Sequence, residues 1–207
     1  MTTSAQHHQN TSQTRPQTDI DRLAEAWVAT EIELSPERRV ELGADGDKAE
    51  YGDYSSAAAP RKRAAIVDVL SKLDPLTEAD EVDRVTALAL RRRLGLEVEM
   101  IAAPLHLRAL SNIASPAQDI RRGFDLMPRE TVSDFEDIAR RFENLPAAIE
   151  GYTERLSAGI AAGVVPAKRQ VREVAMQTGE YAASGNFFEQ RAASNPAIGE
   201  VSDALRE

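Results

Sequence analysis

The chain has 207 residues, of which 42% are hydrophobic, 29% charged and 5% aromatic, a length that allows one domain with a sizeable core or two small domains. Its 34 acidic residues outnumber the 25 basic ones and give a net charge of −9, which disfavours nucleic acid as a partner because polyanions are repelled. Since there is no cysteine, disulfides, thiolate nucleophiles and zinc–thiolate sites are excluded.

The N-terminal segment Met1–Gln17 is polar and lacks the apolar stretch of a signal peptide. We expect residues 1–17 to form a disordered tail and residues 18–207 to form a helical domain. No segment approaches the ~18 apolar residues of a membrane span, so we expect no membrane partner. The predicted location is the cytoplasm.

Apolar residues recur at steps of three and four, and proline and glycine separate the periodic stretches. This pattern predicts an all-α fold, a multi-helix array of about seven to nine amphipathic helices joined by Pro-containing turns. The first helix is expected from about Asp19, with Trp27 filling the core beneath it. Ser35 and Pro36 predict a cap and a new helix start, followed by an irregular loop over residues 43–54.

A second long helix is predicted from Ser55 or Ser56 to about Leu73. The next is expected to begin at a capping box formed by Thr77 and Asp80 and to end near residue 101. Its expected apolar positions are Val82, Val85, Leu88, Ala89 and Leu96.

Residues 103–114 are predicted to be an irregular apolar connection, after which Ser115 and Pro116 open a helix to about residue 127. Thr131 or Ser133 should cap the following helix, and Pro146 is expected to start a separate one that ends near residue 163. A further helix is predicted from residue 166 to 182. One or two more could follow around the apolar residues Phe187, Phe188, Ile198, Val201 and Leu205.

The sequence contains few candidates for catalysis. It has no His-Glu-x-x-His pair, no glycine-rich phosphate loop and no Gly-x-Ser-x-Gly elbow. His106 is the lone histidine outside the predicted tail, and one imidazole cannot form a two-histidine metal site. We therefore assign no catalytic residue and no metal ligand, and expect His106 to form hydrogen bonds in the core or in a loop.

The most distinctive polar cluster surrounds the predicted helix start at residue 116. A helix N-terminus favours anions, and polar side chains are crowded there. A tightly specified turn also explains the cluster, yet this is the place where we expect a functional cleft surface. Its candidate residues are Asn112, Ser115, Gln118, Asp119 and Arg121.

The stretch from Leu107 to Arg121, continuing through residues 124–128, resembles the signature of a bacterial family known as domain of unknown function 885. The segments 138–146 and 152–171 are similar to that family too, so the resemblance covers about residues 19–180. The family is mostly helical, is typically well over twice as long, and looks like a zinc-dependent peptidase whose metal-binding His and Glu residues lie in the C-terminal half.

The resemblance implies that this chain corresponds to the N-terminal helical portion of a larger fold, without the metal-binding half and inactive alone. No cofactor is expected in this chain, and zinc only in the full-length family. The alternative is a stand-alone helical module that binds a protein partner. We expect the partner, either the missing half or another protein, to contact the segment Phe187–Leu205. Formation of a homo-oligomer is a further expectation.

Overall fold

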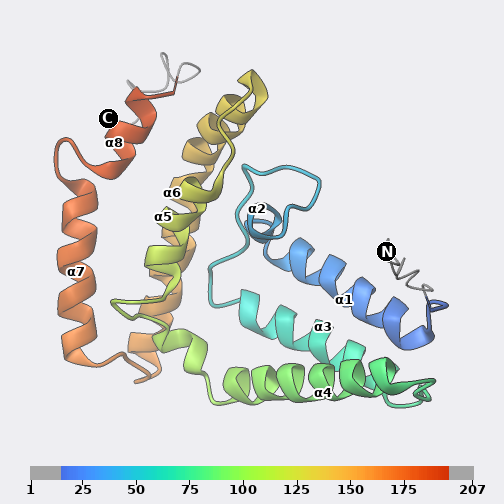
Figure 1. The fold of residues 1–207 in the computed structure, drawn as a ribbon. Helices are drawn as coiled ribbons and strands as arrows, with labels where there is room; N and C mark the ends of the chain where they lie inside the picture. The colour runs from blue at the N-terminus through green and yellow to red at the C-terminus, as the bar shows by residue number, and fades with distance from the viewer. Residues whose placement is uncertain (1–14, 196–207) are drawn as a thin grey trace, which may run out of the picture.

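The computed structural model describes residues 15–195 and confirms the all-α fold. In this range the chain forms eight α-helices and one 3₁₀-helix, within the predicted number (Figure 1). The helices are α1 (Asp19–Leu34), α2 (Arg38–Leu42), α3 (Ala58–Leu73), α4 (Glu81–Ala102), η1 (Leu105–Arg108), α5 (Pro116–Leu126), α6 (Val132–Ala161), α7 (Lys168–Ala182) and α8 (Phe187–Ala193). None of these helices is both long enough and apolar enough to cross a bilayer.

Helices α1, α3 and α4 pack together into an N-terminal three-helix unit. Trp27 of α1 is buried, as predicted, against Ile66 and Val69 of α3 and Leu94 of α4. A second small cluster joins Ile20, Leu73 and Ala87 at the other end of the same unit. Burial of these apolar faces holds the unit together.

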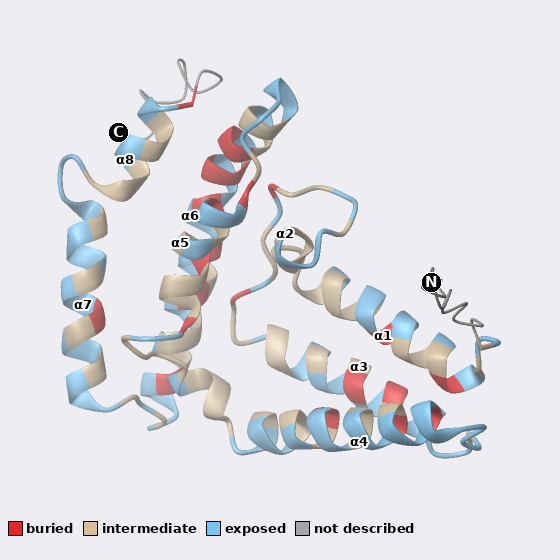
Figure 2. Ribbon diagram, viewed as in Figure 1, coloured by how far each residue is buried: buried red, intermediate tan, exposed pale blue. Residues whose placement is uncertain are grey.

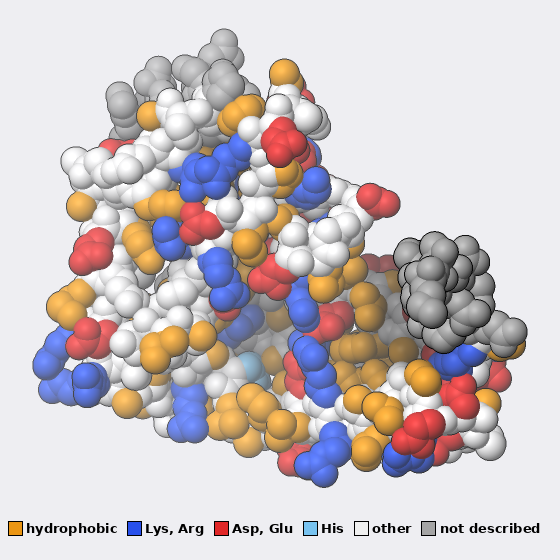
Figure 3. Space-filling view, in the orientation of Figure 1, with side chains coloured by type: hydrophobic (Ala, Val, Ile, Leu, Met, Phe, Trp, Pro, Cys, Tyr) orange, Lys and Arg blue, Asp and Glu red, His pale blue; other side chains and the backbone are white. Residues whose placement is uncertain are grey.

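The prediction of which residues form the buried apolar face of α4 is wrong. Four of its five positions, Val82, Val85, Leu88 and Leu96, are about half exposed, and Figure 3 shows hydrophobic side chains along the outer surface of this helix. The buried face instead contains Asp83, Ala87 and Leu94. Ala87 permits close helix packing, and Asp83 is tolerated at 0% exposure because it is fully hydrogen-bonded.

Asp83 joins the start of α4 to the segment before α1. Its carboxylate accepts hydrogen bonds from the Ala79 N–H at 2.9 Å and the Thr18 hydroxyl at 2.7 Å, and it pairs with Arg15 at 3.3 Å. These bonds outweigh the opposing effect of burial and lower the pKa of Asp83. A hydrophobicity pattern cannot anticipate a buried carboxylate of this kind.

The prediction that Pro146 starts a separate helix is wrong, because α6 runs unbroken through this residue. Ile138, Phe142, Leu145 and Tyr152 are buried on one continuous face, visible in Figure 2 as the largest run of buried residues. Pro146 itself lies on the exposed side. An internal proline costs about 3 kcal/mol, which the burial of several large side chains on this face offsets.

Two predicted helix starts also differ from the structure. Helix α2 begins at Arg38 after a turn, so Ser35 is not its cap. The cap of α4 is Asp80 itself, whose carboxylate accepts the Asp83 N–H at 2.9 Å, in place of the predicted capping box. The predicted cap at Thr131 is confirmed, with Asp134 completing a capping box. Most of the predicted tail, residues 1–14, and the apolar positions at 198, 201 and 205 lie outside the described residues.

The core of the C-terminal part surrounds Arg141 of α6, which has 0% exposure. One guanidinium nitrogen donates to the Lys48 carbonyl at 2.7 Å, and the guanidinium carbon lies 4.3 Å from the centre of the Tyr51 ring. Gly123 of α5 leaves the room for this group, since a Cβ there would lie 2.5 Å from it. Arg141 thereby fixes the loop over residues 43–57 against α5 and α6.

Replacing Arg141 by Ala is expected to lower the free energy of unfolding by roughly 2–4 kcal/mol, because it leaves a void and an unpaired carbonyl. The neighbouring Arg140 is exposed and pairs with Asp47 and Asp137, so Arg140→Ala should cost at most about 1 kcal/mol. Urea denaturation of both variants measures the difference, and equal losses would contradict the central role of Arg141.

Helix α6 meets η1 at Gly159, which is buried. A Cβ at this position would lie 2.5 Å from the Leu107 carbonyl oxygen and 2.8 Å from that of Val164. Gly159 therefore permits the close approach of α6 to the backbone at Leu107 and Val164. Gly163 instead follows the helix in a left-handed conformation with φ of 69° and ends α6.

Gly159→Ala should destabilise the fold by about 2 kcal/mol, since two backbone segments must move apart. Gly179→Ala is the matched control, because Gly179 lies in α7 with open space around it. That variant should gain about 0.5–1 kcal/mol from helix propensity. Thermal unfolding should therefore show a lower melting temperature for Gly159→Ala and a higher one for Gly179→Ala. An unchanged melting temperature in Gly159→Ala would refute the close approach.

Candidate functional site

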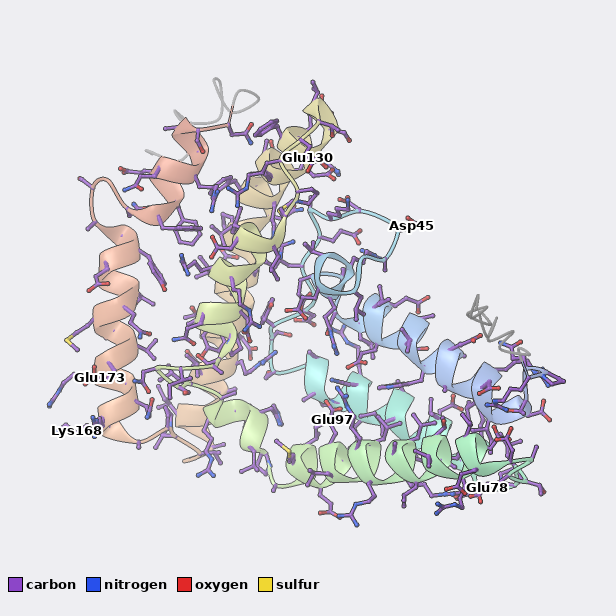
Figure 4. All side chains as sticks on the ribbon, in the orientation of Figure 1. Asp45, Glu78, Glu97, Glu130, Lys168 and Glu173 are labelled. Carbon is purple, nitrogen blue, oxygen red and sulfur yellow. The ribbon has the colours of Figure 1, made fainter. Side chains whose placement is uncertain are left out.

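A large apolar groove runs between α6 on one side and α7 and α8 on the other, with a volume of about 980 Å³. Figure 4 labels Lys168 and Glu173 on α7, the helix that forms its outer wall. Hydrophobic side chains dominate the lining, with Ile120 of α5, Phe142, Leu145, Ile149 and Leu156 of α6, Val171 and Val174 of α7, and Phe188 of α8. Such a groove is suited to apolar segments of a ligand or a partner.

Three of the five predicted cleft residues fix α7 in place. The Asn112 N–H donates to the Gln170 side chain at 2.7 Å, and the Asn112 carbonyl accepts from Gln177 at 3.1 Å. Gln118 donates to Gln177 at 2.8 Å and accepts from the Ser115 hydroxyl at 2.6 Å. The cluster around the start of α5 thus holds the outer wall of the groove through side-chain hydrogen bonds.

The other two predicted residues point elsewhere. Asp119 pairs with Arg122 at 2.9 Å, and Arg121 pairs with Asp125 at 3.3 Å while its guanidinium lies 4.2 Å from the centre of the Phe187 ring. Asp125 also binds Arg191 of α8 at 2.9 Å. The five residues therefore do not converge on one point, and Arg121 contributes to the attachment of α8.

Asp119 has an unusual electrostatic environment. Burial raises the pKa of its carboxyl, and the charges of Glu41 and Glu37 raise it further, against the opposing effect of Arg122. Burial likewise raises the pKa of Tyr152, whose hydroxyl donates to the Ala109 carbonyl at 2.8 Å. The pKa of one carboxyl beside the motif is thus raised, but the two groups do not form a paired acid and base.

Sequence reasoning missed Gln170 and Gln177, which carry the bonds from α7. A signal was available, because these two glutamines are seven residues apart and therefore lie on one face of the helix. It also missed the aromatic cluster around Phe188, whose ring lies 5.7 Å from Phe124 and 5.9 Å from Tyr181. Phe187 and Phe188 of the predicted partner segment are thus packed against the core, and Phe188 also lines the groove.

No group of three or more His, Asp or Glu side chains within residues 15–195 is arranged to hold a metal ion. The lone histidine of this range, His106, is not among the groove residues and lies in a smaller cleft described below. Two runs of basic residues, 61–63 and 91–93, each contain a side chain paired with an acid, Lys62 with Glu97 at 2.5 Å and Arg91 with Glu78 at 3.7 Å.

The family model described as "Bacterial protein of unknown function (DUF885)" matches residues 36–207, which is most of the chain. The chain belongs to this family. None of the curated proteins compared with it matches it. In this DUF885 protein the family match includes α2 to α8, and therefore both walls of the groove.

Replacing Gln177 by Ala should loosen α7, because the side chain holds two hydrogen bonds to the α5 cluster. Each is worth about 0.5–1.5 kcal/mol, so amide exchange in α7 should accelerate about tenfold or more. Met176→Ala is the control, since Met176 is 54% exposed on the same helix and outside the groove lining. Hydrogen exchange that rises equally in both variants would contradict the role of Gln177.

Proposed function

We propose that this DUF885 chain is a helical scaffold of a metallopeptidase-like hydrolase and does not catalyse on its own. The His and Glu side chains that bind zinc in such an enzyme are supplied by a separate polypeptide region. This metal-bearing half docks in the apolar groove between α6 and α7–α8. Zinc, when bound by the His and Glu side chains of that half, would act as a Lewis acid and activate water.

The observation that carries the proposal is the groove itself. A volume of about 980 Å³ lined mainly by hydrophobic side chains leaves a large apolar surface in contact with water. Ile149 and Val171 on its two walls are 48% and 45% exposed. Surfaces of this kind mark sites where another chain segment packs, because its burial returns the hydrophobic free energy.

The way in which α7, the outer wall of the groove, is held in place also favours the groove as a docking site. Helix α7 buries only Val174, and hydrogen bonds from Asn112 and Gln118 position it. A wall held by directional bonds across an open groove can accept an inserted segment without losing its own support. The family-like motif at residues 107–128 would then serve to shape the docking groove and have no role in the chemistry.

A second candidate function is a stand-alone helical interaction module. The exposed apolar stripe of α4 favours it, since Val85, Leu88, Leu96 and Met100 are each between 46% and 58% exposed. This stripe is separate from the groove and offers a helix face to a protein partner.

The proposal is tested with the purified chain and the separately produced metal-bearing half of a longer DUF885 protein. Alone, the chain should bind no stoichiometric zinc and show no chelator-sensitive peptide hydrolysis. Together, the two should form a complex measurable by calorimetry. Ile149→Asp should weaken this complex at least about tenfold, because a charge enters the apolar groove.

Ile160→Asp is the matched control, since Ile160 is 70% exposed on the same helix and does not line the groove. It should leave the affinity within about twofold. Tight zinc or peptidase activity in the chain alone would overturn the scaffold assignment. Equal weakening by both variants would show that the groove is not the docking surface. A partner bound only through α4 would favour the interaction module.

A further inference from the structure

A smaller, polar cleft of about 260 Å³ lies where the N-terminal three-helix unit meets α6. Its lining comes from the end of α1, the turn before α2, the loop at residues 52–54, α3, α4, η1 and α6. Figure 3 shows this face of the molecule hollowed between the two parts, with side chains of both charges at its edges. Three acids and four basic side chains, His106 included, line the cleft.

The acids of the cleft are already bound. Glu37 accepts from the Gly52 N–H at 2.8 Å and the Tyr54 hydroxyl at 3.3 Å. Asp53 pairs with Arg61 and also accepts the N–H of Ser55 at 2.7 Å.

Glu97, labelled in Figure 4, lies between α3 and α4 and pairs with Lys62 at 2.5 Å. Glu154, next to Arg155 in the chain, accepts two hydrogen bonds from Ser56, at 2.7 and 2.8 Å. Each carboxylate at or beside the cleft is thus engaged, and so are Arg61 and Lys62.

Two basic side chains of the cleft remain without a partner among the described residues. The Nε of Arg155 and the Nδ1 of His106 are both buried and make no hydrogen bond. Arg155 forms no ion pair within residues 15–195, and its guanidinium lies 5.9 Å from the centre of the Tyr54 ring. Arg155 is half-buried, and leaving its buried Nε–H without an acceptor costs free energy that a bound anion would recover.

We propose that this cleft binds a small ligand through a carboxylate, which Arg155 and His106 hold between α6 and η1. The planar guanidinium presents parallel N–H donors that match the two oxygens of a carboxylate. Burial, and then the charge of Arg155, lower the pKa of His106, so its ring is neutral at pH 7 and can donate one further hydrogen bond. Glu37, Asp53 and Glu97 are engaged with other groups, and Arg61 and Lys62 are paired with two of them, so Arg155 is the cation of the lining left to bind an anion.

The small volume limits the ligand to the size of an amino-acid derivative or the terminal residue of a peptide. The inference does not depend on the proposed function, because the cleft and the groove have no lining residue in common. Binding is measured on the chain by itself, without a metal or a second half.

The test is a titration of the chain with N-acetyl-L-alanine, followed through the side-chain NMR signals of His106 and the Arg155 Nε–H. We expect saturable shifts of both signals. The uncharged N-acetyl-L-alaninamide should produce none, because it lacks the carboxylate. Arg155→Gln should weaken binding at least about tenfold, and Arg155→Lys, which keeps the charge without the planar fork, should weaken it less.

Arg92→Gln is the matched control, since Arg92 is exposed on α4, does not line the cleft and carries the same charge. Its affinity should stay within about twofold of the unaltered chain. The NMR shifts of the unaltered chain test the proposal even where an Arg155 variant does not fold. Equal binding of the amide, tighter binding of inorganic phosphate, or an equal loss in Arg92→Gln would each overturn it.

Discussion

The continuous buried face of α6 is the constraint on which the rest of the structure depends. Ile138, Phe142, Leu145 and Tyr152 stay in phase on both sides of Pro146, so the helix does not break there. Each fully buried side chain contributes about 1.5–3 kcal/mol, which together exceeds the roughly 3 kcal/mol cost of an internal proline. If the helix ended at Pro146, the residues of α6 that pack against α5 and those that line the groove would no longer lie on one continuous helix.

Arg141 extends this constraint to a segment far away in the sequence. Its guanidinium holds the Lys48 carbonyl and the Tyr51 ring, and so fixes the loop that leads to Tyr54 and the polar cleft. Arg141 has no carboxylate partner and its Nε is buried without a hydrogen bond, so the Lys48 carbonyl and the Tyr51 ring provide the contacts that offset its burial. Gly123 is the matching requirement on α5, because any Cβ there would occupy the space of that guanidinium.

Much of the fold was predictable from local signals, because capping residues and apolar periodicity are local. The start of α1, the cap at Thr131 and the start of α5 after Ser115 follow from such signals, whereas Leu105–Arg108 of the predicted irregular connection form η1. The buried face of α4 was not predictable from local sequence. The cost of burying the Asp83 carboxylate is offset by hydrogen bonds from Thr18 and Arg15, which lie more than sixty residues away in the chain. Pro146 misled for a similar reason, since tertiary burial overrides a local preference.

The predicted site residues likewise depend on contacts with residues that are far away in the sequence. Polar residues are crowded around Ser115 in the sequence, but the bonds from this segment to Gln170 and Gln177 of α7 form only in the folded chain. His106 looked ordinary in the sequence, because its environment comes from Arg155, about fifty residues later in the chain. A hydrogen-bonding group acquires a binding role only from what surrounds it in space. Residues of α6 line both the apolar groove and the polar cleft, so the two surfaces that we propose for binding depend on the same helix.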